Sequence, residues 1–523
     1  MSLLSTLIKR ILFSILFIPS TALSNSHSSA QPSITLNKQP TTLRISYDYL
    51  NMPNNIEKMG LLGVNYFANI NSWLYSGVGM YGSTVGTKGG LFVFTVDGGL
   101  RHRLFYNIWG DTGLDIGGGG GGASLVGGGL MIRPHVGLQY DFGLAQLGVY
   151  YSYITFPTGE IHSSQIGANI DLPFDVYYTT HQNTYHTFKL EDIHITANKF
   201  LALQFLDFGL LFQAYQQHEG TLNTNNQIQD GTIGLLGAEF DHYFLHSLFW
   251  WVKGSGAFTG ISNGYMDILT GLGYKLALGT DSGFSILPQI GAGAGGGGKV
   301  DTGGGILIQP QLSLEIPLWK NFALRTGGGY IWAPEGQLGA WTITGMLLYH
   351  FNAVVGSTTD TPLQHNIFTT QAWRLHIFNQ TYTAPQRASN ETTSAITLLA
   401  LQIDQLFNHY FFLAYQGAFA YAGFQSGGYA SGMIGPGLQT TSFLHDRVAC
   451  FTELLIGAGG GGGLQLSGGA LIEPIVGFHI NFTKMLGLQT SVGELKALSD
   501  HLSTPVVNVG FTLQFDTVNV SAP

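Results

Sequence analysis

One ordered block occurs three times along this chain and constrains the fold more than any other feature. Each copy has a glycine-rich run after an isoleucine, a second short glycine group, and then an Ile-x-Pro triplet. The three runs are Gly117–Gly122, Gly291–Gly298 and Gly457–Gly463, and the three prolines are Pro134, Pro310 and Pro474. Glycine runs alone arise in low-complexity sequence, but the same ordered set three times indicates repeated structural units. We therefore predict three homologous units, at 41–178, 184–352 and 365–516.

Strict alternation of apolar and polar residues follows each glycine block. Over Leu130–Phe142 the even positions are apolar or Pro, and the odd positions are mostly polar or Gly. Ile306–Leu318 and Ile472–Phe482 repeat this pattern. Side chains alternate faces in a strand, so each segment is predicted to be a strand with one apolar face. We count about eight such segments per unit, hence about 24 antiparallel strands, and the chain has room for the ~9–11 residues that each membrane-spanning strand needs.

Composition favours a membrane barrel over a soluble all-β protein. Charged residues are 10% of the 523, against about 25% in soluble domains. The polar face of the strands is mostly Gly, Ser, Thr, Gln, Asn and Ala rather than charged, whereas soluble surfaces are well charged. The net charge of −9 lacks the basic excess of a nucleic-acid binder, and the single Cys allows no intramolecular disulfide. A secreted sandwich or propeller is the soluble alternative.

Residues 1–24 have the layout of a secretory signal peptide. Lys9 and Arg10 precede the apolar segment Ile11–Ile18, and Ala22-Leu23-Ser24 gives a small-x-small cleavage signature. We expect cleavage near Ser24. After residue 24 the sequence has no run of about 18 apolar residues, so it predicts no transmembrane helix.

With these features the chain resembles outer-membrane β-barrel proteins of Gram-negative bacteria. The resemblance rests on the signal peptide, the alternating strands and the aromatic-ended final strand Val507–Phe515. It implies an outer-membrane location, contact with outer-membrane lipid, and recognition of Val507–Phe515 by the barrel assembly machinery. The chain departs from the usual pattern because Asp516–Pro523 follows the terminal Phe.

The strands can close in two ways. We favour one ring of about 24 strands, since duplication can enlarge a barrel; the alternative is three tandem eight-stranded barrels, which the polar stretch Gly356–Asn366 between units favours. Eight strands leave an interior that side chains fill, whereas larger rings can hold a channel. In the same strands the recurrent Pro predicts a bulge, and the glycines predict close backbone approach.

The inward face supplies the candidate functional residues. We expect these to share one wall lining a lumen, or alternatively to form an internal hydrogen-bonded plug. The candidates are Arg133, His135, Gln139, Asp141, Gln309, Gln311, Glu315, Glu473, His479 and Asn481. The leading hypothesis is a porin-like channel or binding barrel for small, weakly charged solutes; the alternative is a structural or adhesive surface barrel without a pore.

Catalytic, cofactor and metal sites are not predicted. Gly293-x4-Gly298-Lys299 resembles a phosphate-binding loop, but Val300 stands where Ser or Thr would bind magnesium. The 17 His show no HExxH or Cys/His cluster. An outer-membrane hydrolase using His162 with Ser163 or Ser164 is the remaining enzyme hypothesis, but we do not expect an enzyme.

Overall fold

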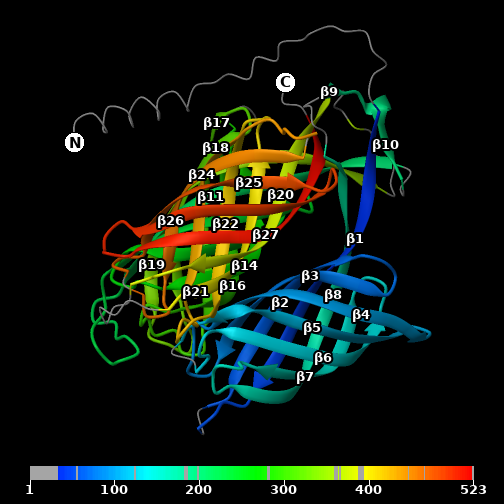
Figure 1. Ribbon diagram of the computed structural model, residues 1–523. Helices are drawn as coiled ribbons and strands as arrows, with labels where there is room; N and C mark the ends of the chain where they lie inside the picture. Colours follow the sequence, from blue (N-terminus) through cyan, green and yellow to red (C-terminus); the bar gives the residue numbers. More distant parts are fainter. Residues whose placement is uncertain are drawn as a thin grey trace, which may run out of the picture. The chain divides into compact units, whose positions relative to one another are not determined.

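The computed structural model describes residues 33–54, 57–122, 125–181, 187–196, 200–279, 283–357, 363, 367–386, 394–445, 447–464 and 466–520. The predicted signal peptide and its cleavage site lie outside these residues. The described residues form 27 strands and a single short 3-10 helix, Leu190–Asp192 (Figure 1). Among them, no helix has the length and apolar character needed to cross a membrane.

The first eight strands form a closed antiparallel ring, the first barrel. Closure is made by β1 and β8, whose residues pair from Asn37 opposite Tyr178 to Tyr47 opposite Ala168. The ring contains β1 (Ile34–Leu50), β2 (Met59–Asn69), β3 (Leu74–Val85), β4 (Phe92–Phe105), β5 (Ile108–Gly120), β6 (Leu130–Asp141), β7 (Gln146–Thr155) and β8 (His162–Thr180).

The second barrel repeats this order. β11 and β19 close it by pairing from Phe200 opposite Ser357 to Gln217 opposite Ala340. The ring contains β11 (Phe200–Gln217), β12 (Thr232–Tyr243), β13 (Leu248–Gly260), β14 (Met266–Tyr274), β16 (Ser285–Gly296), β17 (Ile306–Trp319), β18 (Phe322–Trp332) and β19 (Gly339–Ser357), with the short β15 (Leu276–Ala277) beside β16.

The third barrel repeats it again. β20 and β27 close it by pairing from Phe368 opposite Val520 to Tyr382 opposite Val506. The ring contains β20 (Phe368–Tyr382), β21 (Ile396–Leu406), β22 (Phe411–Ala422), β23 (Ala430–Gln439), β24 (Val448–Gly460), β25 (Ala470–Asn481), β26 (Leu486–Ala497) and β27 (Ser503–Val520).

The favoured prediction of one ring of about 24 strands is therefore wrong, and the alternative of three eight-stranded barrels describes the pairing. The physical reason is that the last strand of each ring pairs its free backbone N–H and C=O groups with the first strand of that same ring. Between rings, pairing is confined to strand ends: Ala353 opposite Asn519, and Phe515 and Asp516 opposite Thr180 and Thr179. Two short strands, β9 (Thr187–Phe188) and β10 (Ile193–Ile195), add to β20 and β1.

In the first barrel, the connections at one end are shorter than those at the other end. We call the end with the shorter connections, and the equivalent end of the other two barrels, the turn end, and we call the opposite end the loop end. In the first barrel the turns are 70–73, 106–107 and 142–145, and the loops are 51–58, 86–91, 121–129 and 156–161. The glycine blocks of all three units lie at the loop end.

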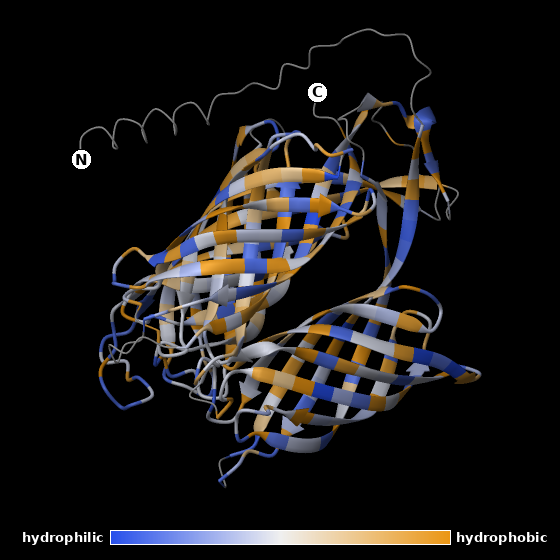
Figure 2. Cartoon of the chain, viewed as in Figure 1, coloured by the Kyte–Doolittle hydropathy of each residue, from blue (hydrophilic) through white to orange (hydrophobic). Residues whose placement is uncertain are grey.

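The strands are polar inside and apolar outside, as their alternation predicts. On β6, Arg133, His135 and Gln139 are buried, whereas Val136 and Leu138 between them are exposed. The colour bands that alternate along the strands in Figure 2 follow this period of two. A soluble eight-stranded barrel needs the reverse distribution, with apolar side chains inside and polar ones outside.

The predicted proline bulge is absent from these strands. Pro134 interrupts the β6–β7 ladder, yet Ile132 opposite Thr155 and His135 opposite Ser152 keep one register. The same interruption without a shift occurs at Pro310 and Pro474. Proline has no N–H to donate, so a ladder pair is lost, but the flanking pairs hold the register.

The glycine blocks pack barrel against barrel, which confirms the prediction of close backbone approach. A Cβ on Gly120 would lie 2.5 Å from the backbone N of Gly428, and one on Gly460 would lie 2.3 Å from the Cα of Gly264. The third equivalent pair is Gly296 with Gly90, where the Cβ would lie 2.6 Å from the backbone N. Only glycine permits these approaches. At each junction the fifth strand of one barrel ends beside the loop after the third strand of the next.

Candidate functional site

The interior of the first barrel is bridged by buried ion pairs. Arg44 of β1 contacts Asp171 of β8 and Asp111 of β5, both at 2.8 Å. Arg133 of β6 contacts Asp115 of β5 at 2.6 Å and Asp48 of β1 at 3.0 Å. Arg44 with Asp171 and Arg133 with Asp115 are pairs between neighbouring strands. Arg44 with Asp111 and Arg133 with Asp48 join strands that are not neighbours, so these two pairs cross the interior.

Two sequence-predicted residues complete this network. The imidazole Nε2 of His135 lies 3.4 Å from Asp111, and Gln139 donates to Asp171 at 3.2 Å. Tyr75 and Tyr81 of β3 donate to Asp111 and Asp115. Six strands of the ring are thus connected through side chains across the interior, counting Ser152 of β7, which donates to Asp48.

The second barrel is bridged around one guanidinium. Arg325 of β18 has no exposed surface and contacts Glu239 at 3.0 Å, Asp241 at 2.8 Å and Glu315 at 3.1 Å. Lys253 of β13 donates to Gln309 of β17 at 2.6 Å. Glu239 and Asp241 lie on β12, so the network again joins opposite strands.

The third barrel carries fewer charges and more amides. Arg374 and His376 of β20 contact Asp404 of β21 at 2.9 and 2.8 Å. Gln380 of β20 donates across the ring to Glu473 of β25 at 3.0 Å. His479 stacks on Phe451 with ring centroids 4.2 Å apart.

An apolar layer at the loop end adds to the polar network in each barrel. Met131, Leu307 and Leu471 occupy the second position of β6, β17 and β25, and none of the three has exposed surface. In the first barrel, other buried apolar side chains lie at the same end as Met131. These are Leu50, Met59, Leu61, Leu91, Val93, Ile154, Phe156 and Ile161. A solute entering from the loop end would meet this layer before the polar one.

The predicted site residues all lie on strands but do not share one wall. The first barrel holds Arg133, His135, Gln139 and Asp141, the second holds Gln309, Gln311 and Glu315, and the third holds Glu473, His479 and Asn481. Asp141 and Asn481 end their strands half-buried, where Asp141 accepts from the Gly143 N–H and Asn481 accepts from Gln514. Gln311 is also half-buried, and the other seven are buried.

Sequence reasoning missed the partners of these residues. The missed charged groups are Arg44, Asp48, Asp111, Asp115, Asp171, Glu239, Asp241, Arg325, Arg374 and Asp404. One signal was present, because Arg44 and Asp48, and likewise Asp111 and Asp115, are four residues apart on one strand and so face the same way.

Of the two serines in the hydrolase hypothesis, Ser163 lies on the opposite face of β8 from His162, whereas Ser164 is exposed on the same face as His162. His162 is exposed and its Nδ1 lies 2.7 Å from Thr155 Oγ1, whereas Ser163 is buried and accepts from the Asn51 N–H. Within the described part of the chain, no group of three or more His, Cys, Asp or Glu could hold a metal ion.

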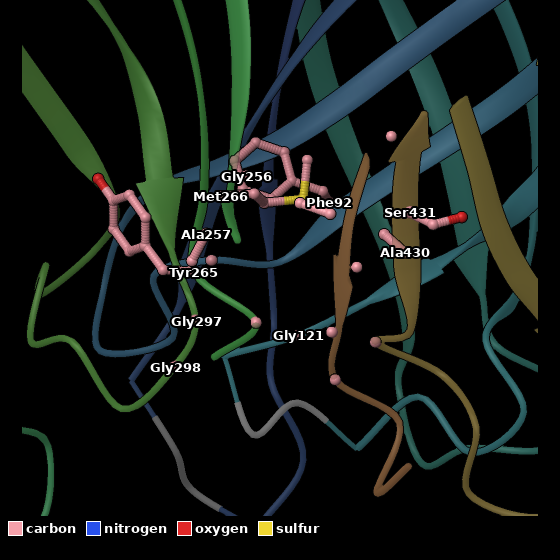
Figure 3. Close-up of a pocket in the computed structure, with 18 of the residues that line it drawn as sticks. Phe92, Gly121, Gly256, Ala257, Tyr265, Met266, Gly297, Gly298, Ala430 and Ser431 are labelled. Atoms are coloured by element: carbon pink, nitrogen blue, oxygen red, sulfur yellow. The ribbon is translucent and has the colours of Figure 1, made fainter. Parts of the chain in front are cut away.

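A cavity lies where the three barrels meet. It has a volume of about 1040 Å³ and is lined by outward-facing residues of all three barrels and by the glycine loops. Phe92 of β4 and Met266 of β14 lie close together at its wall, with Ala430 of β23 across from them (Figure 3). Phe94 of the first barrel stacks on Phe419 of the third, with centroids 6.0 Å apart. The barrel walls of the cavity are therefore made by side chains on the outer faces of the strands.

No family model and no curated protein matches the chain. Among solved structures, the chain is similar to OccK11 (OpdR) of Pseudomonas aeruginosa, with 11% identity, 93% of this chain and 98% of that chain covered, and a TM-score of 0.21. The outer membrane protein OpdK of the same organism has 9% identity, covers 92% and 98%, and has a TM-score of 0.21.

The siderophore receptor PirA of Pseudomonas aeruginosa also matches, with 9% identity, 93% of this chain and 82% of that chain covered, and a TM-score of 0.25. At these identities and TM-scores the matches carry no information on what this chain binds or transports.

Proposed function

We propose that this chain is an integral outer-membrane protein whose three barrels are closed to solutes, and that it serves as a non-conducting structural or adhesive protein of the cell surface. One observation carries the proposal: in each barrel, buried side chains pair across the interior, as Arg133 does with Asp48, Arg325 with Glu239, and Gln380 with Glu473. Eight strands leave room for such side chains and little more.

The outer wall supports the membrane location. Exposed apolar side chains follow one face of the strands, such as Val149 and Tyr151 on β7, and Val509 and Phe511 on β27. Exposed aromatic residues also gather at the turn ends of all three barrels, where an interfacial girdle is expected. They are Trp73, Phe105, Tyr106, Phe142, Phe244, Trp319, Phe407, Tyr410 and Phe482.

Assembly would use the final strand. β27 closes the third barrel against β20, so Val507–Phe515 is both the expected signal for the barrel assembly machinery and the last edge to pair. The predicted cleavage near Ser24 would precede this step. Outer-membrane lipid is the partner of the apolar walls.

Solute binding is the second candidate function. A solute passing through the lumen of a barrel, as the channel hypothesis requires, would have to displace the apolar layer and the polar network described above. The cavity among the three barrels, at about 1040 Å³, is at the upper end of the ~300–1,000 Å³ typical of ligand sites. A binding barrel protein for small, weakly charged solutes would therefore use this junction rather than a barrel interior.

Two measurements test the proposal. Refolded protein in planar bilayers should give no stepwise current, and stepwise current that persists at several voltages would overturn the closed-barrel reading. On a detergent gel, an unheated sample should migrate differently from a boiled one, since closed barrels resist unfolding in detergent. Identical migration of the two samples would count against membrane barrels altogether.

A further inference from the structure

We propose that the cavity among the three barrels binds one amphiphile with a fatty acyl chain and an acidic head group, the head lying beside Lys88 and Lys299. This inference rests on the membrane location proposed above and goes beyond it by naming a site and a ligand class. We call this site the central cavity.

The walls of the central cavity suit an acyl chain. Phe92 and Phe94 form a buried apolar cluster with Ala294 and Phe419. Met266, which is partly buried, packs against this cluster. Four of these five line the cavity, Ala294 being the exception. Burying an acyl chain against such walls is favourable by roughly 25 cal/mol for each Å² of apolar surface removed from water. The same walls continue into the outer surface of the strands, where membrane lipid is the expected solvent.

The loops of the central cavity supply positive charge on one side only. Lys88 and Lys299 both line it, and they stand at the junction of the first and second barrels, where the N–H of Gly89 donates to the carbonyl of Gly303 at 2.8 Å. Neither ammonium group forms an ion pair with another described residue. Asp301, which also lines the cavity, accepts from the N–H of Gly303.

The repeat shows that both lysines depart from their equivalents. At the position of Lys88 the other units have Ser262 and Ser426. Lys299 has a φ of +63°, a left-handed conformation, and stands where the third unit has Gly463 at +69°. Left-handed backbone disfavours a long side chain, so an outlier of this kind motivates a functional hypothesis. We assign these lysines to the head group.

Open space remains at the wall of the third barrel. Gly417 and Gly432 face each other across β22 and β23, both line the central cavity, and a Cβ on either would meet no atom within 4 Å. A large side chain at Gly432 can therefore occupy the cavity without disturbing the barrel. Gly345 of β19 is equally open but does not line the cavity, which makes it the matched control position.

The first test uses cis-parinaric acid, a fluorescent fatty acid, titrated into full-length protein that has been delipidated in detergent. We expect saturable binding to the wild type, binding weakened at least ~10-fold in Gly432→Trp, and unchanged binding in Gly345→Trp. Absence of saturable binding to the wild type would overturn the proposal, as would equal affinity in Gly432→Trp. Heat-dependent gel migration of each variant reports folding separately, so failure of the binding test is distinguishable from failure of the membrane-barrel proposal.

The second test addresses the head group. In Lys88→Ala/Lys299→Ala, affinity for the acid should fall ~10-fold or more while affinity for its uncharged methyl ester stays unchanged, because only a charged head uses the ammonium groups. Equal losses for acid and ester, or no loss for either, would refute this assignment. Displacement of the probe by oleate but not phosphatidylglycerol would identify a free fatty acid as the ligand, and displacement by both would identify a membrane lipid; displacement by neither would overturn the ligand class.

Discussion

Replacing Arg325 by Met tests the closed interior of the second barrel most directly. The change removes the guanidinium that contacts Glu239, Asp241 and Glu315 at 2.8–3.1 Å. Glu315 keeps Lys275 at 2.5 Å. Glu239 keeps only a 3.4 Å hydrogen bond from Gln289, and within the described part of the chain Asp241 keeps no cation.

The magnitude follows from these orphaned groups. Leaving one buried charge without its partner costs about 3–5 kcal/mol, and two carboxylates are orphaned here. We therefore expect Arg325→Met to lower the free energy of unfolding by at least ~4 kcal/mol. Removing the orphans as well, in Arg325→Met/Glu239→Gln/Asp241→Asn, should recover most of that loss. Arg103→Met removes an exposed arginine and should change stability by less than ~0.5 kcal/mol.

Urea unfolding in lipid vesicles, followed by tryptophan fluorescence, measures this effect mainly in the second barrel, which contains Arg325. Five of the eight tryptophans lie in the second barrel: Trp250, Trp251, Trp319, Trp332 and Trp341. The barrels can unfold in separate steps, so the fluorescence transition is compared between variants rather than converted to a stability of the whole chain. A midpoint for Arg325→Met equal to that of the wild type, or a triple variant no more stable than the single one, would refute the reasoning.

Three further predictions concern the walls and junctions. Gly460→Val should separate the second and third barrels without unfolding either, because its Cβ would lie 2.3 Å from Gly264; increased proteolysis between barrels with unchanged heat-dependent gel migration is the expected result, and loss of that migration would contradict it. Phe511→Arg, on the exposed face of β27, should lower stability in vesicles by ~2–4 kcal/mol if it lies at the bilayer midplane, whereas Phe511→Leu should have little effect; equal midpoints would argue against a lipid-facing position. Phe515→Ala should reduce the amount of folded protein in the outer membrane but not its refolding in vitro, and normal amounts in cells would remove the assembly role of Val507–Phe515.

Strands and faces were predictable because they depend on neighbouring residues alone. The predicted segment Leu130–Phe142 matches β6 within one residue, and its buried and exposed sides follow the alternation. The glycine blocks predicted close approach for the same reason, since a run without side chains has few other uses in a strand. What the sequence did not contain was the identity of the backbone being approached.

Closure was not predictable because it depends on distant edges. β1 and β8 satisfy each other's hydrogen-bonding groups, but the same groups would be satisfied by strands of a neighbouring unit in one large ring. The alternation is identical in both arrangements. The central cavity escaped prediction for a related reason, because the alternation places Phe92 and Met266 on the outer faces of their strands and only the packing of three barrels turns them toward one another.

The ring of junctions has a consequence for how this molecule can vary. Each junction joins the fifth strand of one barrel to the loop after the third strand of the next, which is the head-to-tail arrangement of a cyclic trimer. In a homotrimer every substitution would appear three times around the axis. Here the three barrels belong to one chain, which fixes their number and their order. One junction can therefore carry Lys88 and Lys299 while the other two do not. Fusion thus permits an asymmetric centre within a symmetric framework.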